Sequence, residues 1–273
     1  MEAEERCSRR VTLSTQVALS VVDLGDRRSS DVLVLLPGVS DSWRSYEAVL
    51  PHVPNSIRTI AISQRGHGDS DKPQSNYAVR DYAADLRSLL DALEVPRAII
   101  AGHSSASIVA RRFALDHPER VAGLVLEGSP INLDSVPDHV KAELLALRDP
   151  ITREFVRDFN AGTFAQAPPA GFVDAMIDES LKTPARVWRE TVASLFEYDD
   201  ARELSALATP TLIVWGDDDA IIDRSAAEAL ARSIQHSKLL AYDNVGHTPH
   251  WEVPERFARD VSAFVEQCRG ISR

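Results

Sequence analysis

The chain has 273 residues, 44% of them hydrophobic and 26% charged, and its 30 Lys and Arg against 41 Asp and Glu give a formal net charge of −11. The apolar content excludes an intrinsically disordered chain. The acidic balance, with no basic cluster longer than pairs such as Arg9-Arg10, argues against nucleic acid as a partner. We expect one α/β domain with an insertion, since such domains often exceed 200 residues.

The cysteines and the N-terminus indicate a compartment. Cys7 and Cys268 stand near opposite ends of the chain and match neither a disulfide framework nor a paired zinc motif, so we expect reduced thiols in a cytoplasmic protein. The N-terminus begins Met-Glu-Ala-Glu-Glu-Arg without a following apolar segment, which predicts no secretory signal. No run approaches the roughly 20 apolar residues of a membrane-spanning helix, so we expect no membrane partner.

Short apolar runs bounded by Gly, Pro, Asn or Asp predict the strands of a sheet. Several runs are apolar at consecutive positions, which is typical of parallel strands buried on both faces. After a weakly alternating edge hairpin at 11–24, the runs in chain order are 32–36, 57–62, 98–101, 121–126, 211–215 and 238–242.

Helical periodicity lies between these runs. In the clearest predicted helix, 78–94, apolar residues three and four positions apart form one stripe: Val79, Tyr82, Ala83, Leu86, Leu89, Leu90 and Leu93. Further helices are predicted at 104–116, 224–234 and 254–267. Strands and helices alternating in this order imply right-handed crossovers and a mostly parallel, doubly wound sheet.

One segment breaks the alternation. From about Ile131 to Ala208 no strand is predicted, only helical patches at 140–147, 152–160, 172–181 and 185–196. An insertion that emerges from the carboxyl ends of parallel strands lies at the edge where such sheets bind ligands. We therefore expect residues 131–208 to form a helical cap, or lid, over a core domain made of residues 1–130 and 209–273.

The segment Gly102-His103-Ser104-Ser105-Ala106 places a serine between a buried strand and a helix. A serine in a strained strand-to-helix turn needs small residues two positions away on either side, as Gly102 and Ala106 are. Such a turn lifts the Ser104 hydroxyl to the edge of the sheet, beside free N–H groups of the helix. Taken alone, the pattern also suits a serine that merely caps the helix.

Two later loops carry the groups that a serine nucleophile needs, which are a base and a carboxylate that orients it. The segment Trp215-Gly216-Asp217-Asp218-Asp219 follows one predicted strand, and Asn244-Val245-Gly246-His247 follows the next. Because the carboxyl ends of parallel strands meet at one edge of a sheet, Ser104, Asp219 and His247 can converge there.

Together these segments resemble the α/β-hydrolase fold family, in its serine-nucleophile esterase and enol-lactonase-like branch. The elbow is similar to the family's Gly-x-Ser-x-Gly motif, with Ala106 at the last glycine, and the order Ser, acid, His is the family's. The segment from Ser63 to Ser70 resembles its Asp-x-Arg-Gly-x-Gly-x-Ser loop, with Ser63 in place of Asp, and we expect this loop to be structural. The resemblance covers residues 11–267 apart from the cap.

The resemblance implies roles for single residues. Ser104 is the nucleophile, and His247, which directly follows a glycine as in the family, is the base. Asp219 is the acid by the family's Gly-x-x-Asp spacing, with Glu127 as the alternative at the end of an earlier strand. His250 competes with His247 for the role of base.

The resemblance also implies an oxyanion hole built from two backbone N–H groups. One belongs to Ser105, directly after the nucleophile, and the other to Val39 in the loop Pro37-Gly38-Val39, where relatives usually have His-Gly. We expect His103 to shape the site instead of acting as a base. The remaining histidines are expected at the surface or at helix ends: His52, His117, His139 and His236.

The activity that the resemblance implies is hydrolysis of a small-molecule carboxylic ester or lactone through an acyl-enzyme on Ser104. Serine at this position argues against the branches in which aspartate is the nucleophile. The alternatives are a carbon–carbon bond hydrolase, a cofactor-free haloperoxidase-like enzyme, and a ligand receptor that retains a slow triad. The sequence has no metal-binding constellation and no phosphate-binding Gly-x-Gly-x-x-Gly motif, so we expect neither a metal nor a cofactor.

Overall fold

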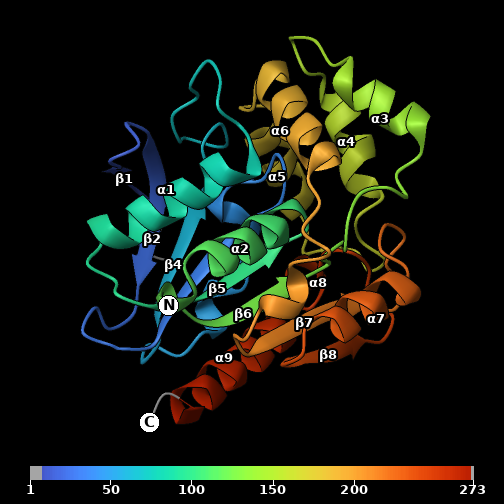
Figure 1. Cartoon of the computed structure of the whole chain (residues 1–273). Helices are drawn as coiled ribbons and strands as arrows, with labels where there is room; N and C mark the ends of the chain where they lie inside the picture. Colours follow the sequence, from blue (N-terminus) through green and yellow to red (C-terminus); the bar gives the residue numbers. More distant parts are fainter. Residues whose placement is uncertain (1–7, 272–273) are drawn as a thin grey trace.

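The computed structural model describes residues 8–271 and contains one eight-stranded sheet in the order β1-β2-β4-β3-β5-β6-β7-β8 (Figure 1). The strand β2 pairs antiparallel with β1 and β4, and all other neighbours are parallel. This confirms the mostly parallel α/β sheet and the edge hairpin. The strands are β1 (Arg9–Thr12), β2 (Ala18–Leu24), β3 (Val32–Leu36), β4 (Arg58–Ser63), β5 (Ala98–His103), β6 (Val121–Glu127), β7 (Thr211–Gly216) and β8 (Ser237–Tyr242).

Helices connect the strands, close to where the periodicity predicts them. Those outside the insertion are α1 (Val79–Ala92), α2 (Ser105–Asp116), α7 (Arg224–Ser233), α8 (Pro249–Glu252) and α9 (Pro254–Ile271). Short 3₁₀ helices lie at Trp43–Tyr46, Leu50–His52, Pro118–Arg120 and Leu204–Ala206. The sequence analysis missed α8 and the 3₁₀ helices because elements this short contain too few residues for a periodic pattern.

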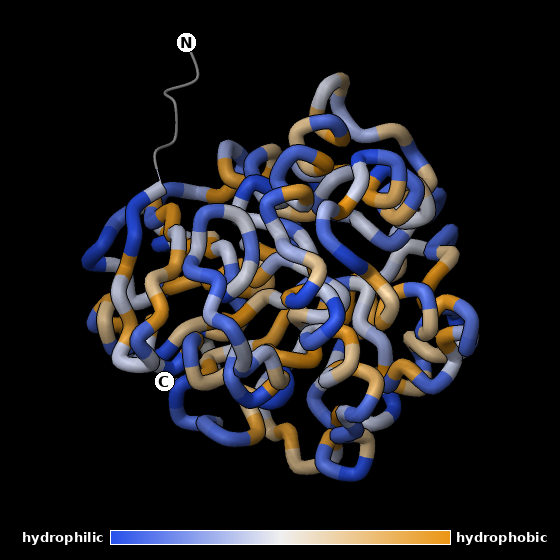
Figure 2. Tube along the Cα trace, turned by 90° about the horizontal axis from the view of Figure 1, so that it is seen from above, coloured by the Kyte–Doolittle hydropathy of each residue, from blue (hydrophilic) through white to orange (hydrophobic). Residues whose placement is uncertain are grey.

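Hydrophobic cores lie on both faces of the sheet, which explains the continuously apolar strands. Neighbouring residues of a strand point to opposite faces. In β3, Val34 belongs to the same core cluster as Phe113 of α2, whereas Leu35 belongs to the cluster that contains Phe257 of α9. Figure 2 shows hydrophobic stretches of the trace running through the interior and hydrophilic stretches mostly at the periphery.

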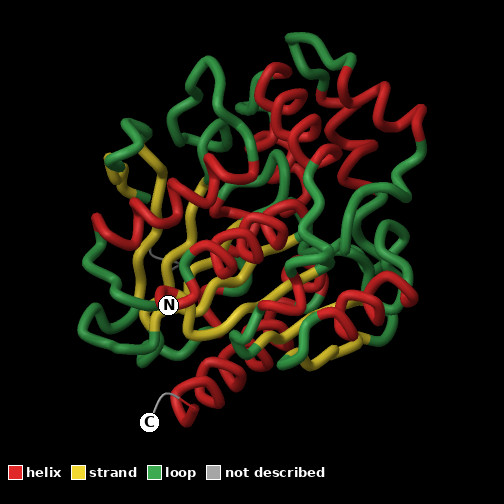
Figure 3. Tube along the Cα trace, viewed as in Figure 1, coloured by secondary structure: helices red, strands yellow, loops and turns green. Residues whose placement is uncertain are grey.

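Residues 131–208 contain four α-helices and no strand, as the sequence predicts. These helices lie between β6 and β7 in the chain and group together beyond one edge of the strands (Figure 3). They are α3 (Asp138–Leu145), α4 (Arg153–Ala161), α5 (Phe172–Ser180) and α6 (Ala185–Glu197).

One buried guanidinium, that of Arg111 on α2, holds both ends of this helical insertion. It donates to the carbonyl oxygens of Pro130 (2.6 Å) and Ile131 (3.3 Å), where the insertion begins. It also donates to both carboxylate oxygens of Asp200 (3.1 and 2.9 Å), near the end of the insertion. Burial raises the pKa of Asp200 in spite of the nearby Arg111. Desolvation thus outweighs the ion-pair attraction, so the pair positions the chain more than it stabilises it.

The structure bears on two of the sequence-based expectations, those about a membrane-spanning helix and about the cysteines. No helix within residues 8–271 is long and apolar enough to cross a membrane. Cys268 is buried on α9, and burial raises the pKa of its thiol to about 11. Cys7 lies outside the described residues, so the expectation of reduced thiols stays a prediction.

We expect Asp200→Ala to lower the free energy of unfolding by about 3–5 kcal/mol, because it leaves the Arg111 guanidinium buried without its counter-charge. Urea denaturation measures this change. The matched control is Glu203→Ala, which removes a 52% exposed partner of Arg112 and is expected to cost less than about 1 kcal/mol. Equal losses in the two variants would contradict the anchoring role of Asp200.

Candidate active site

The turn between β5 and α2 holds Ser104 in a strained conformation. Its φ is 50° and its ψ −119°, a combination that non-glycine residues rarely adopt. A Cβ atom on Gly102 would collide with the carbonyl oxygen of Ala106, so strand and helix approach closely enough to require glycine there. The Ser104 side chain makes no capping hydrogen bond to α2. The serine is therefore not a simple helix cap, and its hydroxyl is left for another partner.

That partner is the imidazole of His247. Ser104 Oγ lies 2.9 Å from His247 Nε2, and His247 Nδ1 lies 2.8 Å from Asp219 Oδ2. The other carboxylate oxygen of Asp219 accepts hydrogen bonds from the backbone N–H groups of Ile221 (2.8 Å) and Ile222 (2.9 Å). Because an ionised carboxylate only accepts, Nδ1 carries the ring proton and Nε2 is free to accept from the Ser104 hydroxyl. The structure thus brings together the three residues singled out from the sequence.

A glycine that the sequence analysis missed makes room for this imidazole. Gly128, directly after β6, has a φ of 52°, and a Cβ atom there would lie 2.9 Å from His247 Nδ1. Only a residue without a side chain lets the chain pass so close to the ring. Its position after Glu127 was the available signal, but nothing in the sequence shows that the His247 loop packs against it.

The backbone of the Pro37–Val39 loop passes beside the serine. A Cβ atom on Gly38 would lie 3.6 Å from Ser104 Cβ, and the side chain of Gln64 fixes the loop by donating to the Pro37 carbonyl oxygen (3.0 Å). Ser105 is the first residue of α2, where backbone N–H groups have no intrahelical acceptor. Val39 lines the same cavity as Ser104, and Ser105 directly follows Ser104 at the start of α2; their role in binding an oxyanion stays a prediction.

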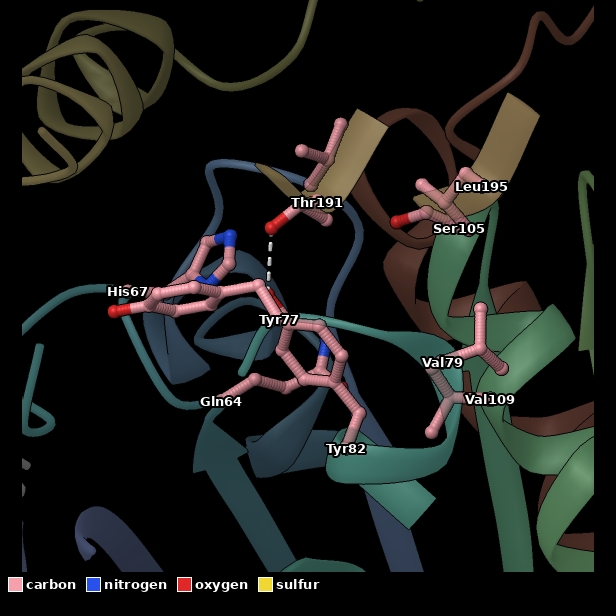
Figure 4. Close-up of a pocket in the computed structure, with 10 residues that line it drawn as sticks. Gln64, His67, Tyr77, Val79, Tyr82, Ser105, Val109, Thr191 and Leu195 are labelled. Atoms are coloured by element: carbon pink, nitrogen blue, oxygen red, sulfur yellow. Dashed lines mark hydrogen bonds between the residues drawn. The ribbon is translucent and has the colours of Figure 1, made fainter. Parts of the chain in front are cut away.

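Two cavities share the lining residue Val39. The Ser104 cavity is lined by Gly38, Val39, Asp41, His103, Ser104, Phe159, Asn160, Thr163, Ile221, His247, Thr248 and Trp251. The Ser105 cavity is lined by Val39, Gln64, His67, Tyr77, Val79, Tyr82, Ser105, Val109, Thr191 and Leu195. Figure 4 shows the Ser105 cavity, with Val79, Val109 and Leu195 near Ser105 and the aromatic residues opposite, where Tyr82 and Thr191 share a hydrogen bond of 2.7 Å.

The loop from Ser63 to Ser70 is held by hydrogen bonds to α1 and within the loop, as expected for a structural loop. The guanidinium of Arg65 donates two hydrogen bonds of 2.6 Å to the Asp85 carboxylate on α1. His67 Nδ1 lies 2.8 Å from the Arg65 carbonyl oxygen and therefore carries the ring proton. Burial lowers the pKa of His67 to about 4, so the ring is neutral.

A second serine–histidine–carboxylate chain lies next to the first. Ser45 Oγ is 2.8 Å from His250 Nε2, and His250 Nδ1 is 2.8 Å from Glu127 Oε1. Ser45 and His250 are 0% exposed and Glu127 is 1% exposed, whereas Ser104 is partly exposed and lines a cavity. The alternative base and the alternative acid thus pair with each other, away from Ser104, and no substrate can reach Ser45.

Ser45 also contacts a second buried acid, Asp41. Burial lowers the pKa of His250 well below its usual value, so the ring is neutral and carries one N–H. Ser45 Oγ accepts from the Trp251 indole (2.8 Å) and donates to Asp41 Oδ2 (3.1 Å). Burial and the nearby Glu127 raise the pKa of Asp41 to about 7, while the hydrogen bond from Ser45 acts in the opposite direction.

The His103 ring lies between the two chains. Its Nε2 is 3.0 Å from the His247 carbonyl oxygen and donates to it, so His103 supports the backbone of the base loop and does not contact Ser104 as a base. Within the described residues, Asp41, His103 and His250 form one buried group whose possible metal-ligand atoms lie within 4.8 Å of one another. Because two of these side chains already bind Ser45, a metal would have to displace that hydroxyl.

The four remaining histidines lie at the surface or at a helix end, as the sequence analysis expects. His52, His139 and His236 are exposed, and His117 directly follows α2.

Comparison with known proteins is consistent with this architecture. A family model described as alpha/beta hydrolase fold matches residues 31–254, which include Ser104, Asp219 and His247. A non-heme chloroperoxidase from Streptomyces lividans is 29% identical, over 84% of this chain and 88% of its own length. A 2-hydroxymuconate semialdehyde hydrolase from Pseudomonas sp. (strain CF600) is 31% identical, over 85% of this chain and 84% of its own. An esterase structure from Rhodococcus sp. ECU1013 is 27% identical and superposes with a TM-score of 0.82, covering 95% of this chain and 98% of that one.

We expect the two buried acids to make stability depend on pH. Burial raises the pKa values of Asp41 and Glu127 to about 7, above the ordinary values of 3.8 and 4.5 that we assign to the unfolded chain. Between about pH 4 and 7 the folded protein therefore holds more protons, so the contribution of these acids to stability is complete below pH 4 and is lost as the pH rises through 7. The slope is at most about 1.4 kcal/mol per pH unit for each group.

Asp41→Asn, which cannot ionise, is expected to make this decline shallower in urea denaturation followed between about pH 5 and 8. Asp158→Asn, at an exposed position, serves as the control and should leave the slope unchanged. Identical slopes in wild type and both variants would show that Asp41 does not hold a proton in the folded state.

Proposed function

This chain belongs to the alpha/beta hydrolase fold family, and we propose that it hydrolyses a carboxylic ester or lactone through an acyl-enzyme on Ser104. The observation that carries the proposal is the hydrogen-bond chain from Ser104 through His247 to Asp219, whose serine end opens onto a cavity. An unactivated hydroxyl is a weak nucleophile, and the imidazole nitrogen at 2.9 Å supplies the base that it needs.

The reaction follows from the positions of these groups. Ser104 Oγ attacks the carbonyl carbon as His247 Nε2 takes its proton, and Asp219 stabilises the imidazolium that forms. The N–H groups of Val39 and Ser105 bind the oxygen that becomes negative. The imidazolium then gives its proton to the departing alkoxide, which leaves an acyl ester on Ser104. Water, deprotonated by the same imidazole, attacks this ester and releases the carboxylic acid.

We include residues 131–208 in the proposal as a cap that closes the site. Phe159, Asn160 and Thr163 of this segment line the Ser104 cavity, and Thr191 and Leu195 line the Ser105 cavity. A substrate whose carbonyl group lies at Ser104 would therefore contact cap residues on both sides.

Cleavage of a carbon–carbon bond is the second candidate, favoured by the relative named 2-hydroxymuconate semialdehyde hydrolase. A panel of esters, lactones and 2-hydroxymuconate semialdehyde separates the two reactions, since an esterase should turn over the first two classes repeatedly. A single slow turnover with a ligand-dependent rise in melting temperature would instead indicate a receptor.

We expect Ser104→Ala to reduce ester hydrolysis by at least about 10³-fold, because the other serine paired with a histidine, Ser45, is fully buried. A fluorophosphonate should label wild-type protein at Ser104, as mapped by mass spectrometry. Ser45→Ala is the matched control, since it removes the serine of the buried second chain and should leave labelling of Ser104 intact. Labelling at Ser45, or substantial hydrolysis by Ser104→Ala, would overturn the proposed nucleophile.

The two candidate acids are tested by a second pair of variants. Asp219→Asn keeps the shape of the side chain but favours the wrong imidazole tautomer, and we expect kcat to fall by about 10³–10⁴-fold. Glu127→Gln alters only the partner of His250 and is expected to cost less than about tenfold. Steady-state kinetics at one pH, with melting curves to verify folding, compares the two. The reverse order of effects would assign the acid role to Glu127.

A further inference from the structure

We propose that Asn160 is a specificity residue, whose side-chain amide donates a hydrogen bond to a neutral oxygen acceptor on the substrate. The substrate class would then be an ester or lactone with a second oxygen function, such as a ketone, ether, hydroxyl or amide carbonyl. This inference rests on the proposed hydrolysis at Ser104 and extends it to the substrate.

The first reason is the state of the amide itself. Asn160, at the end of α4, is only 2% exposed, and its Nδ2 is enclosed without any hydrogen-bond partner. The residue lines the cavity that also contains Ser104 and His247. An amide nitrogen left unpaired in the interior costs free energy, and nearly all buried polar groups are paired. The nitrogen is covered in this structure, so the side chain has to rotate toward the cavity, where a substrate acceptor would satisfy the amide.

The second reason is that Asn160 is fixed relative to the base. The backbone carbonyl oxygen of Asn160 accepts from both the backbone N–H (2.9 Å) and the hydroxyl (2.7 Å) of Thr163. The Thr163 carbonyl oxygen in turn accepts from the backbone N–H of His247 (2.8 Å) and the hydroxyl of Thr248 (3.1 Å). The end of α4 and the base loop therefore hold each other in place.

Further contacts strengthen this attachment. The Glu252 carboxylate accepts from the backbone N–H groups of Ala165 (2.9 Å) and Gln166 (2.8 Å) on the insertion, and from that of Gly246 (3.0 Å) on the base loop. A Cβ atom on Gly246 would lie 2.6 Å from the Ala165 nitrogen. A residue held this firmly next to the base can discriminate between substrates at the reacting centre.

The surroundings of Asn160 determine the charge of the acceptor. Among the residues lining the Ser104 cavity within the described chain, none is Lys or Arg. A carboxylate on the substrate would be desolvated there without a cation, which is unfavourable. An uncharged oxygen is therefore the better acceptor.

The test uses a series of alkyl fluorophosphonates of equal chain length in which an ether oxygen replaces each methylene in turn. These probes react once with Ser104, so the measurement does not depend on turnover. We expect one position of the ether to label wild type faster than the plain alkyl probe does. In Asn160→Leu, which has a similar shape without the donor, the ratio of these rates should fall by about tenfold. Asn160→Asp, which cannot donate when ionised, should lose the same preference.

The control is Gln166→Leu, which removes the hydrogen bond from Gln166 Nε2 to the Asn244 carbonyl oxygen (2.6 Å) but lies outside the cavity. It should keep the ether preference. Loss of the preference in this control as well would attribute it to the attachment of the insertion and overturn the role of Asn160. An unchanged ratio in a folded, labelled Asn160→Leu would overturn it too. A wild-type protein without labelling at Ser104 would instead overturn the proposed function, and the inference with it.

Discussion

The backbone turn at Ser104 is the constraint on which the rest of the site depends. A serine with a φ of 50° costs about 1–3 kcal/mol, and it persists because its surroundings determine it. The backbone N–H of Ser104 donates to the Glu127 carbonyl oxygen of the neighbouring strand (2.8 Å). The close approach of Ala106 to Gly102 also restricts the conformation of the turn between them. The hydrophobic cores on both faces of the sheet offset the free-energy cost of this turn. The turn directs the Ser104 hydroxyl away from its own helix and toward His247.

Burial distinguishes two hydrogen-bond chains that are otherwise alike. In both chains the serine oxygen lies within 2.9 Å of an imidazole Nε2, and the imidazole Nδ1 lies 2.8 Å from a carboxylate oxygen. The hydrogen-bond chain that begins at Ser45 is closed off from solvent. Ser45 also accepts a hydrogen bond from Trp251, so this chain connects the segment after β3 with α8. The chain from Ser104 ends at a cavity. Chemistry requires access as well as geometry, and hydrogen-bond distances alone would not have told the two chains apart.

The sequence predicted those features that depend on local patterns. Apolar runs and helical periodicity located the parallel strands and the longer helices. The resemblance of the loops after β5, β7 and β8 to the family's motifs singled out Ser104, Asp219 and His247, which the structure brings together. What the sequence did not predict depends on side chains far apart along the chain. Nothing local indicates that Glu127 pairs with His250 or that Asp200 meets Arg111, because each pairing exists only after the sheet has formed. Asn160 was missed for the same reason, since an asparagine at a helix end is ordinary until a cavity surrounds it.

The helical insertion is held unevenly, and this bears on how a substrate is recognised. Arg111 fixes the chain where the insertion begins and near where it ends, and the hydrogen bonds of Thr163 fix its middle to the base loop. Between these anchors, α3 has no buried residue, whereas Val156 and Asn160 of α4 are buried. Helices with few buried contacts open at lower free energy than those packed in a core. The part of the insertion that lines the Ser104 cavity is thus held more firmly than α3. Recognition there depends on preformed positions, which suits a site that must hold a carbonyl group between a strained serine and two backbone N–H groups.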